Sequence, residues 1–174
     1  MTYNLIYMAK PIYGGWVTFT SHLSLKTNSS IFKVSKRDET RYRDFGYGTN
    51  YQNKSIDIIK TLPNLYITAI DKHYYQYLSL FPKGTYLVIH DPTELKDKTN
   101  PLIHGLLEHF NIITIRPTVY KWLKLNYNIQ STLIHHPFYR YPKESYPSMN
   151  NFAVSISRID FDKNTDILLQ YNNK

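Results

Sequence analysis

Short blocks of apolar residues recur along this chain, separated by glycine, proline and polar segments. Residues 3–9 are apolar on both faces, which predicts a buried first strand. Elsewhere, short apolar or alternating blocks predict strands, and apolar residues three or four apart predict helices. The further expected strands are 31–34, 65–70, 85–89, 111–115 and 132–134, and the expected helices include 55–62, 71–80, 102–110 and 117–126. Residues 37–54 are polar and punctuated by glycine, which predicts a loop or an edge hairpin.

A pair of glycines joins the first strand to the first helix. After Gly14 and Gly15, the residues Trp16, Phe19 and Leu23 recur at i, i+3 and i+7, which is one face of a helix. Glycine lets the backbone approach a bound group closely, and the N–H groups at a helix N-terminus attract anions. The pattern therefore predicts either an anion-binding turn or a tight turn that binds nothing.

Strands alternate with helices over most of the chain. Such alternation predicts an α/β fold, a Rossmann-like parallel sheet with helices on both faces, which we expect to span residues 1–140. Residues 141–151 carry Pro142 and Pro147 without apolar periodicity and predict a linker. One more strand at 152–156 and one more helix at 163–171 predict the start of a second domain over residues 152–174.

The composition narrows the class of protein. Of the 174 residues, 42% are hydrophobic, which is too apolar for a disordered chain. There is no cysteine, which excludes disulfides, thiolate catalysis and cysteine-zinc sites. No apolar run is long enough to span a membrane, and the start lacks a basic secretory segment, so a cytoplasmic location is expected. Frequent Asn, Lys, Ile and Tyr indicate an AT-rich genome, viral or archaeal, and a viral protein would work in the host cytoplasm.

The formal charge of +8 favours acidic partners such as nucleic acid, anionic lipid headgroups or sugar-nucleotide phosphates. The basic residues are scattered, apart from Lys33, Lys36 and Arg37, and from Arg41 and Arg43. Together with 17 tyrosines on which bases could stack, the charge leaves open a second class of function. In that class the protein is a non-catalytic Rossmann-like binding module for nucleic acid. Many tyrosines lie in apolar blocks, however, which predicts positions in the core.

Polar residues follow several of the expected strands, at the carboxyl edge where α/β sheets bind ligands. They are Lys10, Asp71, His90, Asp91, Arg116, His135 and His136. Any one of them, taken alone, could be a structural residue at the end of a strand rather than a ligand-binding residue. Their convergence on one rim nevertheless predicts a pocket. The adjacent His135 and His136 point to opposite faces, and His104 and His109 do not share a helix face, so no metal site is predicted. A nucleophile-elbow motif is also absent from the sequence.

Two motifs near opposite ends of the chain carry a resemblance to a known family. The first is P-x-x-G-G-W over residues 11–16, and the second is S-R-I-D-x-x-K-N-x-D-I-L-L over residues 157–169, with His90-Asp91 between them. Together they resemble the retaining glycosyltransferases of the two-Rossmann (GT-B) type, family 4-like. The resemblance implies that residues 1–140 are the N-terminal acceptor domain and that residues 152–174 begin the donor domain.

The resemblance also implies roles for individual residues. The donor diphosphate would be held by Gly14, Gly15, Arg158 and Lys163, where two cations stabilise the charge that grows on the leaving group. His90 would be the catalytic-site residue that hydrogen-bonds a hydroxyl of the donor sugar. Possible acceptor or rim residues are Lys10, Tyr13, Asp91 and Arg116. The implied donor is a nucleotide sugar, the acceptor is a glycan, a protein or a nucleic acid, and no cofactor or metal is implied.

The donor domain of this family continues well beyond the second motif and carries a Glu-x7-Glu pair that binds sugar and ribose. The present sequence ends at Lys174. We therefore expect a fragment, a natural short form, or a domain completed by another chain, and no activity from these residues alone. Residues 152–174 cannot form a core by themselves, so we expect them to dock on the first domain or to pair with a second copy in a homodimer.

Overall fold

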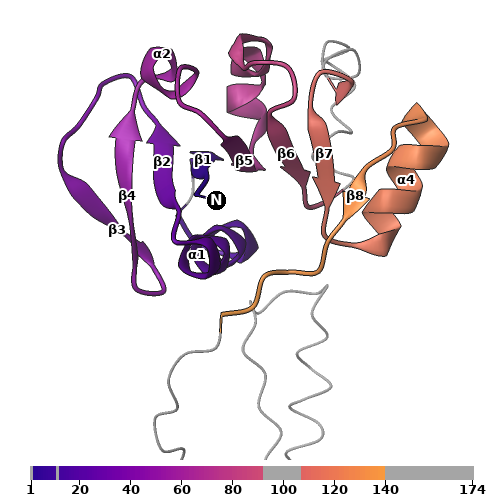
Figure 1. Cartoon of the computed structure of the whole chain (residues 1–174), viewed down its shortest axis with the longest axis horizontal. Coiled ribbons are helices and arrows are strands. Elements are labelled where there is room, and N and C mark those ends of the chain that lie inside the picture. The colour runs from indigo at the N-terminus through magenta and orange to yellow at the C-terminus, as the bar shows by residue number, and fades with distance from the viewer. Residues whose placement is uncertain (1, 11, 92–106, 140–174) are drawn as a thin grey trace, which may run out of the picture. The chain divides into compact units, whose positions relative to one another are not determined.

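The computed structural model describes residues 2–10, 12–91 and 107–139, as Figure 1 shows in colour. The chain divides into two units, residues 1–139 and 140–174, and the described residues all belong to the first. The predicted linker, the strand at 152–156, the helix at 163–171 and most of the helix at 102–110 lie outside the described residues. Within the described ranges, no helix is long and apolar enough to cross a membrane.

A mostly parallel sheet, of eight strands over the described residues, forms the centre of this unit (Figure 1). The order is β3-β4-β2-β1-β5-β6-β7-β8, and every neighbouring pair is parallel except β3 with β4. The strands are β1 (Asn4–Met8), β2 (Ser30–Val34), β3 (Tyr42–Gly46), β4 (Thr49–Lys54), β5 (Leu65–Ile70), β6 (Tyr86–Ile89), β7 (Asn111–Thr114) and β8 (Thr132–Leu133). The predicted α/β, Rossmann-like fold is confirmed.

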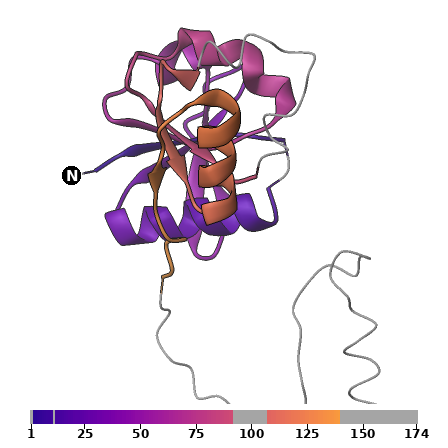
Figure 2. The same ribbon diagram turned by 90° about the vertical axis from the view of Figure 1, so that its right-hand side faces the viewer.

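Helices cover both faces of the sheet, as predicted (Figure 2). On one face lies α1 (Gly15–Thr27), whose Phe19 is fully buried while Trp16 and Leu23 are half-buried against the same apolar cluster. The other face is covered by α2 (Ile56–Ile59), the 3-10 helix η1 (Lys72–Leu80) and α4 (Pro117–Tyr127). The predicted apolar face of the first helix is thus the face that packs on the sheet.

The two central strands are buried on both sides, which explains their continuous apolar sequences. In β1 and the residue after it, Leu5 to Ala9 have no exposed surface, and every residue of β5 is buried. The side chains of Leu5 and Tyr7 join the cluster beneath α1, whereas Ile6 and Met8 join the cluster beneath the other helices. A strand that contributes to two cores in this way must be apolar at every position.

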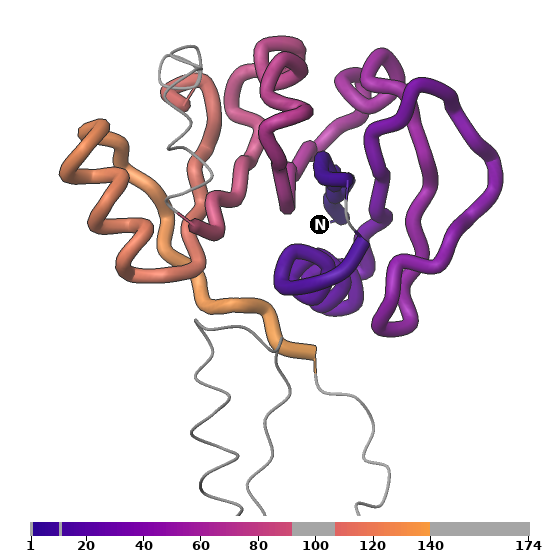
Figure 3. Tube along the Cα trace, turned by 180° about the vertical axis from the view of Figure 1, so that it is seen from behind, coloured from indigo at the N-terminus to yellow at the C-terminus, as the bar shows by residue number. Residues whose placement is uncertain are grey.

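The polar segment over residues 37–54 forms the edge hairpin that was one of its two predicted structures. Strand β3 pairs antiparallel with β4, and β4 pairs parallel with β2, so β3 is an outer strand of the sheet (Figure 3). The turn uses positive φ angles at Gly46 (96°), Tyr47 (54°) and Gly48 (71°). Glycine adopts such angles without steric cost, which is why the segment needs its two glycines.

Some helices differ from their predicted extent. The predicted helix at 55–62 is regular only over Ile56–Ile59, because the backbone turns toward Pro63 soon afterwards. Residues 72–80 are helical as predicted but in the tighter 3-10 form, with Asp71 capping the N–H of His73. Helix α4 begins at Pro117, as expected for proline in a first turn, and ends at Asn128 in the left-handed conformation.

Candidate functional site

The order of the strands reverses at the centre of the sheet. From β1 the chain proceeds to β2 and β4 on one side, and then returns to β5 on the other side. In open α/β sheets, ligands bind outside the carboxyl ends of the strands at such a switch point. Here the switch point lies between β1 and β5, and the segments that leave these strands are the glycine turn and the segment beginning at Asp71.

Only one of the two glycines, Gly14, has a backbone conformation that requires glycine. Gly14 has φ 85° and ψ −166° and forms the N-cap of α1, where its carbonyl oxygen accepts hydrogen bonds from the N–H and hydroxyl of Thr18, both at 3.2 Å. The φ of Gly15 is not in the left-handed region. A Cβ atom added at either glycine would meet no described atom within 4 Å. Among the described residues, nothing therefore packs against the Cβ positions of the turn, which precedes a helix N-terminus where N–H groups lack intrahelical partners.

A lysine from the neighbouring strand holds the segment that leads into this turn. The Lys33 ammonium, half-buried at the end of β2, donates to the carbonyl oxygens of Ala9 (2.7 Å) and Lys10 (3.1 Å). It also lies 5.7 Å from the centre of the Tyr7 ring. Burial lowers the pKa of Lys33, while the Asp71 carboxylate opposes that shift. A positive charge is thereby fixed beside the backbone that precedes the glycines.

A carboxylate from the other neighbouring strand holds the same segment. Asp71, directly after β5, accepts the N–H of Lys10 on Oδ2 and the N–H of His73 on Oδ1, both at 2.8 Å. Its own N–H donates to the carbonyl of Met8 at 2.9 Å. Burial, and next the charge of Asp71, raise the pKa of the Tyr7 hydroxyl, which therefore stays neutral. The Lys33 ammonium of β2 and the Asp71 carboxylate after β5 thus both hydrogen-bond to the backbone segment that follows β1.

The structure buries His90, which was predicted to face the donor sugar. Its side chain is 6% exposed and packs edge-on against Phe19 (ring centroids 4.9 Å apart) and Trp16 (6.4 Å), behind the first turns of α1. Nε2 lies 2.7 Å from the carbonyl oxygen of Thr68. Because a carbonyl only accepts, Nε2 carries the proton. Burial lowers the pKa of His90 to about 4, against the opposing effect of the Thr68 hydrogen bond, so the ring is neutral near pH 7.

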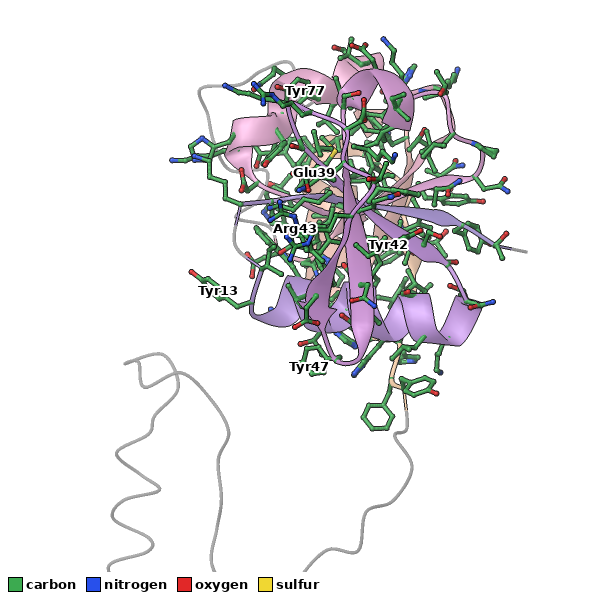
Figure 4. All side chains as sticks on the ribbon, turned by 90° about the vertical axis from the view of Figure 1, so that its left-hand side faces the viewer. Tyr13, Glu39, Tyr42, Arg43, Tyr47 and Tyr77 are labelled. Carbon is green, nitrogen blue, oxygen red and sulfur yellow. The ribbon has the colours of Figure 1, made fainter. Side chains whose placement is uncertain are left out.

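The other predicted rim residues are spread along the carboxyl edge. Lys10 is exposed, and Tyr13 is 77% exposed and points away from the N-terminal end of α1 (Figure 4). Asp91 and Arg116, which follow β6 and β7, form an ion pair at 3.6 Å with both side chains largely exposed. The structure thus brings Lys10, Tyr13 and the glycines together on one loop. Arg158 and Lys163 lie outside the described residues.

Aromatic and histidine rings of α1 pack against the segment after β8, an arrangement that the sequence did not predict although it singled out His136. His22 packs edge-on against His136 and Phe138, with ring centroids 6.1 and 5.8 Å apart, and its Nδ1 lies 3.0 Å from the carbonyl of Pro137. Phe19 also contacts His136 at 5.4 Å. Over the part of the chain that the structure describes, no three His, Cys, Asp or Glu side chains are placed to bind a metal ion.

Hollows also occur at the opposite, amino edge of the sheet. One, of about 340 Å³, is lined by the loops before β5 and β6, and another, of about 490 Å³, lies where β6, β7 and β8 begin. Tyr86 lines both, and its ring stacks on Tyr66 at 5.5 Å. Neither hollow is lined by a predicted site residue, because those predicted residues that the structure describes follow the carboxyl ends of the strands.

Comparisons with protein-family models, with curated proteins and with solved structures found no match for this chain. The functional assignment therefore depends on the residues themselves, on their arrangement and on the resemblance of the two sequence motifs.

Proposed function

We propose that this chain is the acceptor-side half, with the first elements of the donor-side half, of a retaining glycosyltransferase of the GT-B type. The observation that carries the proposal is the position of the Gly14-Gly15 turn. It opens α1 at the switch point between β1 and β5, no described atom lies within 4 Å of a Cβ placed on either glycine, and the Lys33 ammonium binds the carbonyl groups of Ala9 and Lys10 at the start of the same loop. This arrangement suits the diphosphate of a nucleotide sugar, which needs donors and positive charge but no metal ligand from this unit.

The proposal divides the work between the described unit and the C-terminal motif. The glycine turn contacts the diphosphate through backbone N–H groups, while Arg158 and Lys163 neutralise the charge that develops as the glycosidic bond breaks. Lys10 and Tyr13, exposed on the same loop, contact the acceptor. With Nε2 bonded to the Thr68 carbonyl, His90 can reach a sugar hydroxyl only through its other ring nitrogen, so its main effect is to support α1.

The proposal is tested by transfer assays with a panel of UDP- and GDP-sugars. We expect no turnover from the 174 residues alone, and we expect turnover from a longer protein in which they are joined to a donor domain. In that longer protein, Arg158→Ala and Lys163→Ala should each lower kcat at least tenfold, because each removes a cation that acts mainly in the transition state. Lys124→Ala, on an exposed position of α4, is the matched control and should leave kcat unchanged.

Two outcomes would contradict the proposal. Turnover by the isolated 174 residues would show that no further half is needed. A protein that contains these residues and a donor domain, yet neither transfers nor hydrolyses any nucleotide sugar, would contradict the glycosyltransferase proposal itself.

A further inference from the structure

The two groups of basic residues that stand out in the sequence meet at one edge of the folded sheet. Residues 35–41 connect β2 to β3 and close over the strand ends, where the N–H of Ser35 donates to the carbonyl of Lys54 (2.9 Å) and that of Glu39 to Asn53 (3.0 Å). The antiparallel pairing of β3 with β4 starts β3 at the same carboxyl edge. Exposed cations on this loop are Lys36, Arg37 and Arg41.

The carboxylates of this region are engaged with the chain itself. Asp38 accepts the N–H (2.7 Å) and the hydroxyl (3.1 Å) of Ser55, which fastens the loop to the start of α2. Asp44 accepts the N–H of Gly46 at 3.0 Å and shapes the hairpin turn. Residues 33–44 contain five Lys and Arg against three Asp and Glu. Every one of these carboxylates braces backbone or a neighbouring side chain, so the cations of the loop face the solvent.

The third carboxylate fixes one of the cations. Glu39 accepts two hydrogen bonds from the guanidinium of Arg43, at 2.9 and 3.0 Å, and a third from the side chain of Asn53 at 2.9 Å. These bonds lower the pKa of Glu39, so it stays ionised. Lys36, Arg37 and Arg41 have no such partner among the described residues, and they remain available to an anion.

An exposed aromatic ring directly follows the last of these cations in the sequence. Tyr42 is 66% exposed and stands between Arg41 and Arg43 in the sequence. Because side chains alternate along a strand, Tyr42 and Arg43 point to opposite faces of β3. Figure 4, which looks onto this outer strand, shows Glu39 and Arg43 on one side of it and Tyr42 on the other. The exposed side chains of residues 36–43 are basic, acidic, Thr or Tyr, without an aliphatic or Phe side chain that could enter a membrane.

We propose that the loop between β2 and β3, together with Tyr42, binds single-stranded nucleic acid. Lys36, Arg37 and Arg41 contact successive phosphates, and a base stacks on the Tyr42 ring. Cations that follow a backbone, beside aromatic rings that accept any base, are the general requirements for binding a single strand without sequence preference. Binding of nucleic acid is a function separate from glycosyl transfer and is measured separately. A negative result in the binding experiment would therefore not contradict the proposed glycosyltransferase activity.

Fluorescence anisotropy with a labelled oligo-dT of about 15 nucleotides, measured from about 50 to 200 mM salt, tests the inference. Each phosphate contact to a single strand contributes about 0.7 to the slope of log Kd against log salt. We expect the double variant Lys36→Gln/Arg37→Gln to reduce that slope by about 1.4. Tyr42→Ala should weaken binding about fivefold or more and leave the slope unchanged, because it removes stacking but no charge.

The matched control is Lys121→Gln/Lys124→Gln, which removes the same charge from exposed positions of α4. We expect it to bind oligo-dT like the wild type. Absence of salt-dependent binding, or equal losses in the control and the loop variant, would overturn the inference. Binding of polyphosphate or of anionic vesicles as tight as that of oligo-dT, with no effect of Tyr42→Ala, would overturn it in favour of a partner without bases. Thermal melts of all variants should match the wild type, because every substituted side chain is exposed.

Discussion

Lys33 comes from β2, yet its ammonium fixes the backbone that leaves β1. Its sequence neighbours suggested membership of a basic surface group, and the structure instead places it half-buried against two carbonyl oxygens. A lysine between the apolar Phe32 and Val34 of a predicted strand is the signal that could have found it. The contact itself joins residues 23 and 24 positions apart, so no local pattern predicts it.

Replacing Lys33 by Met should lower the free energy of unfolding by about 1–3 kcal/mol, because the partly buried carbonyl group of Ala9 and the exposed one of Lys10 lose their donor. Urea unfolding monitored by circular dichroism measures the change. Lys36→Met, at an exposed position three residues further on, should change it by less than about 0.5 kcal/mol. Equal stability of the Lys33 variant and the wild type would show that these hydrogen bonds do not hold the loop.

His90 was predicted from a strand end, and its position at that end is correct, but its burial was not foreseen. The sequence shows the strand and the polar residue that follows it, whereas the covering Phe19 and Trp16 come from α1, about 70 residues earlier. Burial of this kind depends on how a helix packs across the sheet. The ring is neutral near pH 7 and packs against the helix, while its expected contact with a ligand stays a prediction.

The lowered pKa of His90 predicts a specific loss of stability in acid. The folded-state pKa is about 4 against 6.5 for the free side chain, so the contribution is fully present above pH 6.5 and is lost as the pH falls to about 4. The loss over this window should be about 3 kcal/mol relative to His90→Gln, which can keep a hydrogen bond to Thr68 without titrating. Urea unfolding of both proteins across this pH range measures it. Parallel pH profiles for the two proteins would contradict the assignment.

At the scale of elements, the strand, glycine turn and helix were predicted from apolar spacing and two glycines alone. The prediction succeeded because β1 is apolar on both faces and α1 has one apolar face. Both patterns can be recognised within a short stretch of sequence, without knowledge of distant contacts. The edge hairpin was predicted less sharply, since its polar strands lack alternation. The roles of the two glycines were also not distinguished, because only the backbone angles separate them.

Those angles predict different results for the two glycines. Gly14→Ala should lower the free energy of unfolding by about 1–2 kcal/mol, because φ 85° is strained for any residue with a Cβ. Gly15→Val should keep the melting temperature close to that of the wild type, since its Cβ meets no described atom. It should instead weaken nucleotide-sugar binding by placing side-chain atoms in front of the turn. A Gly15→Val protein that binds normally would show that the turn is purely structural.

At the scale of the whole molecule, the sequence predicted a Rossmann-like unit that ends near residue 140, and the compact unit ends at residue 139. The order of the strands, and therefore the switch point, did not follow from the sequence, because pairing between strands is a long-range property. The resemblance to glycosyltransferases assigned roles at both ends of the chain. All of these roles stay predictions, and Arg158 and Lys163 lie outside the described residues.

The described unit contains both of its apolar clusters, which predicts that it folds alone. A protein of residues 1–139 should melt cooperatively and retain α/β circular dichroism. The full chain should associate or melt higher, because residues 152–174 are expected to bury an apolar face against this unit or a second copy. Light scattering and thermal melts of both proteins decide this. Identical melting temperatures and masses consistent with monomers would contradict a docking role for the tail.

The proposed function requires that the glycine turn at the switch point binds the diphosphate of a nucleotide sugar. The most direct measurement is an NMR titration of the isotope-labelled chain with UDP-glucose and GDP-mannose, with uridine and free glucose as controls. We predict weak binding in which the amide signals of Gly14, Gly15 and Trp16 shift with the nucleotide sugars but not with the controls. The signals around Tyr86, at the opposite edge of the sheet, should not move. Unchanged signals at the turn, or shifts confined to the Tyr86 edge, would contradict the account.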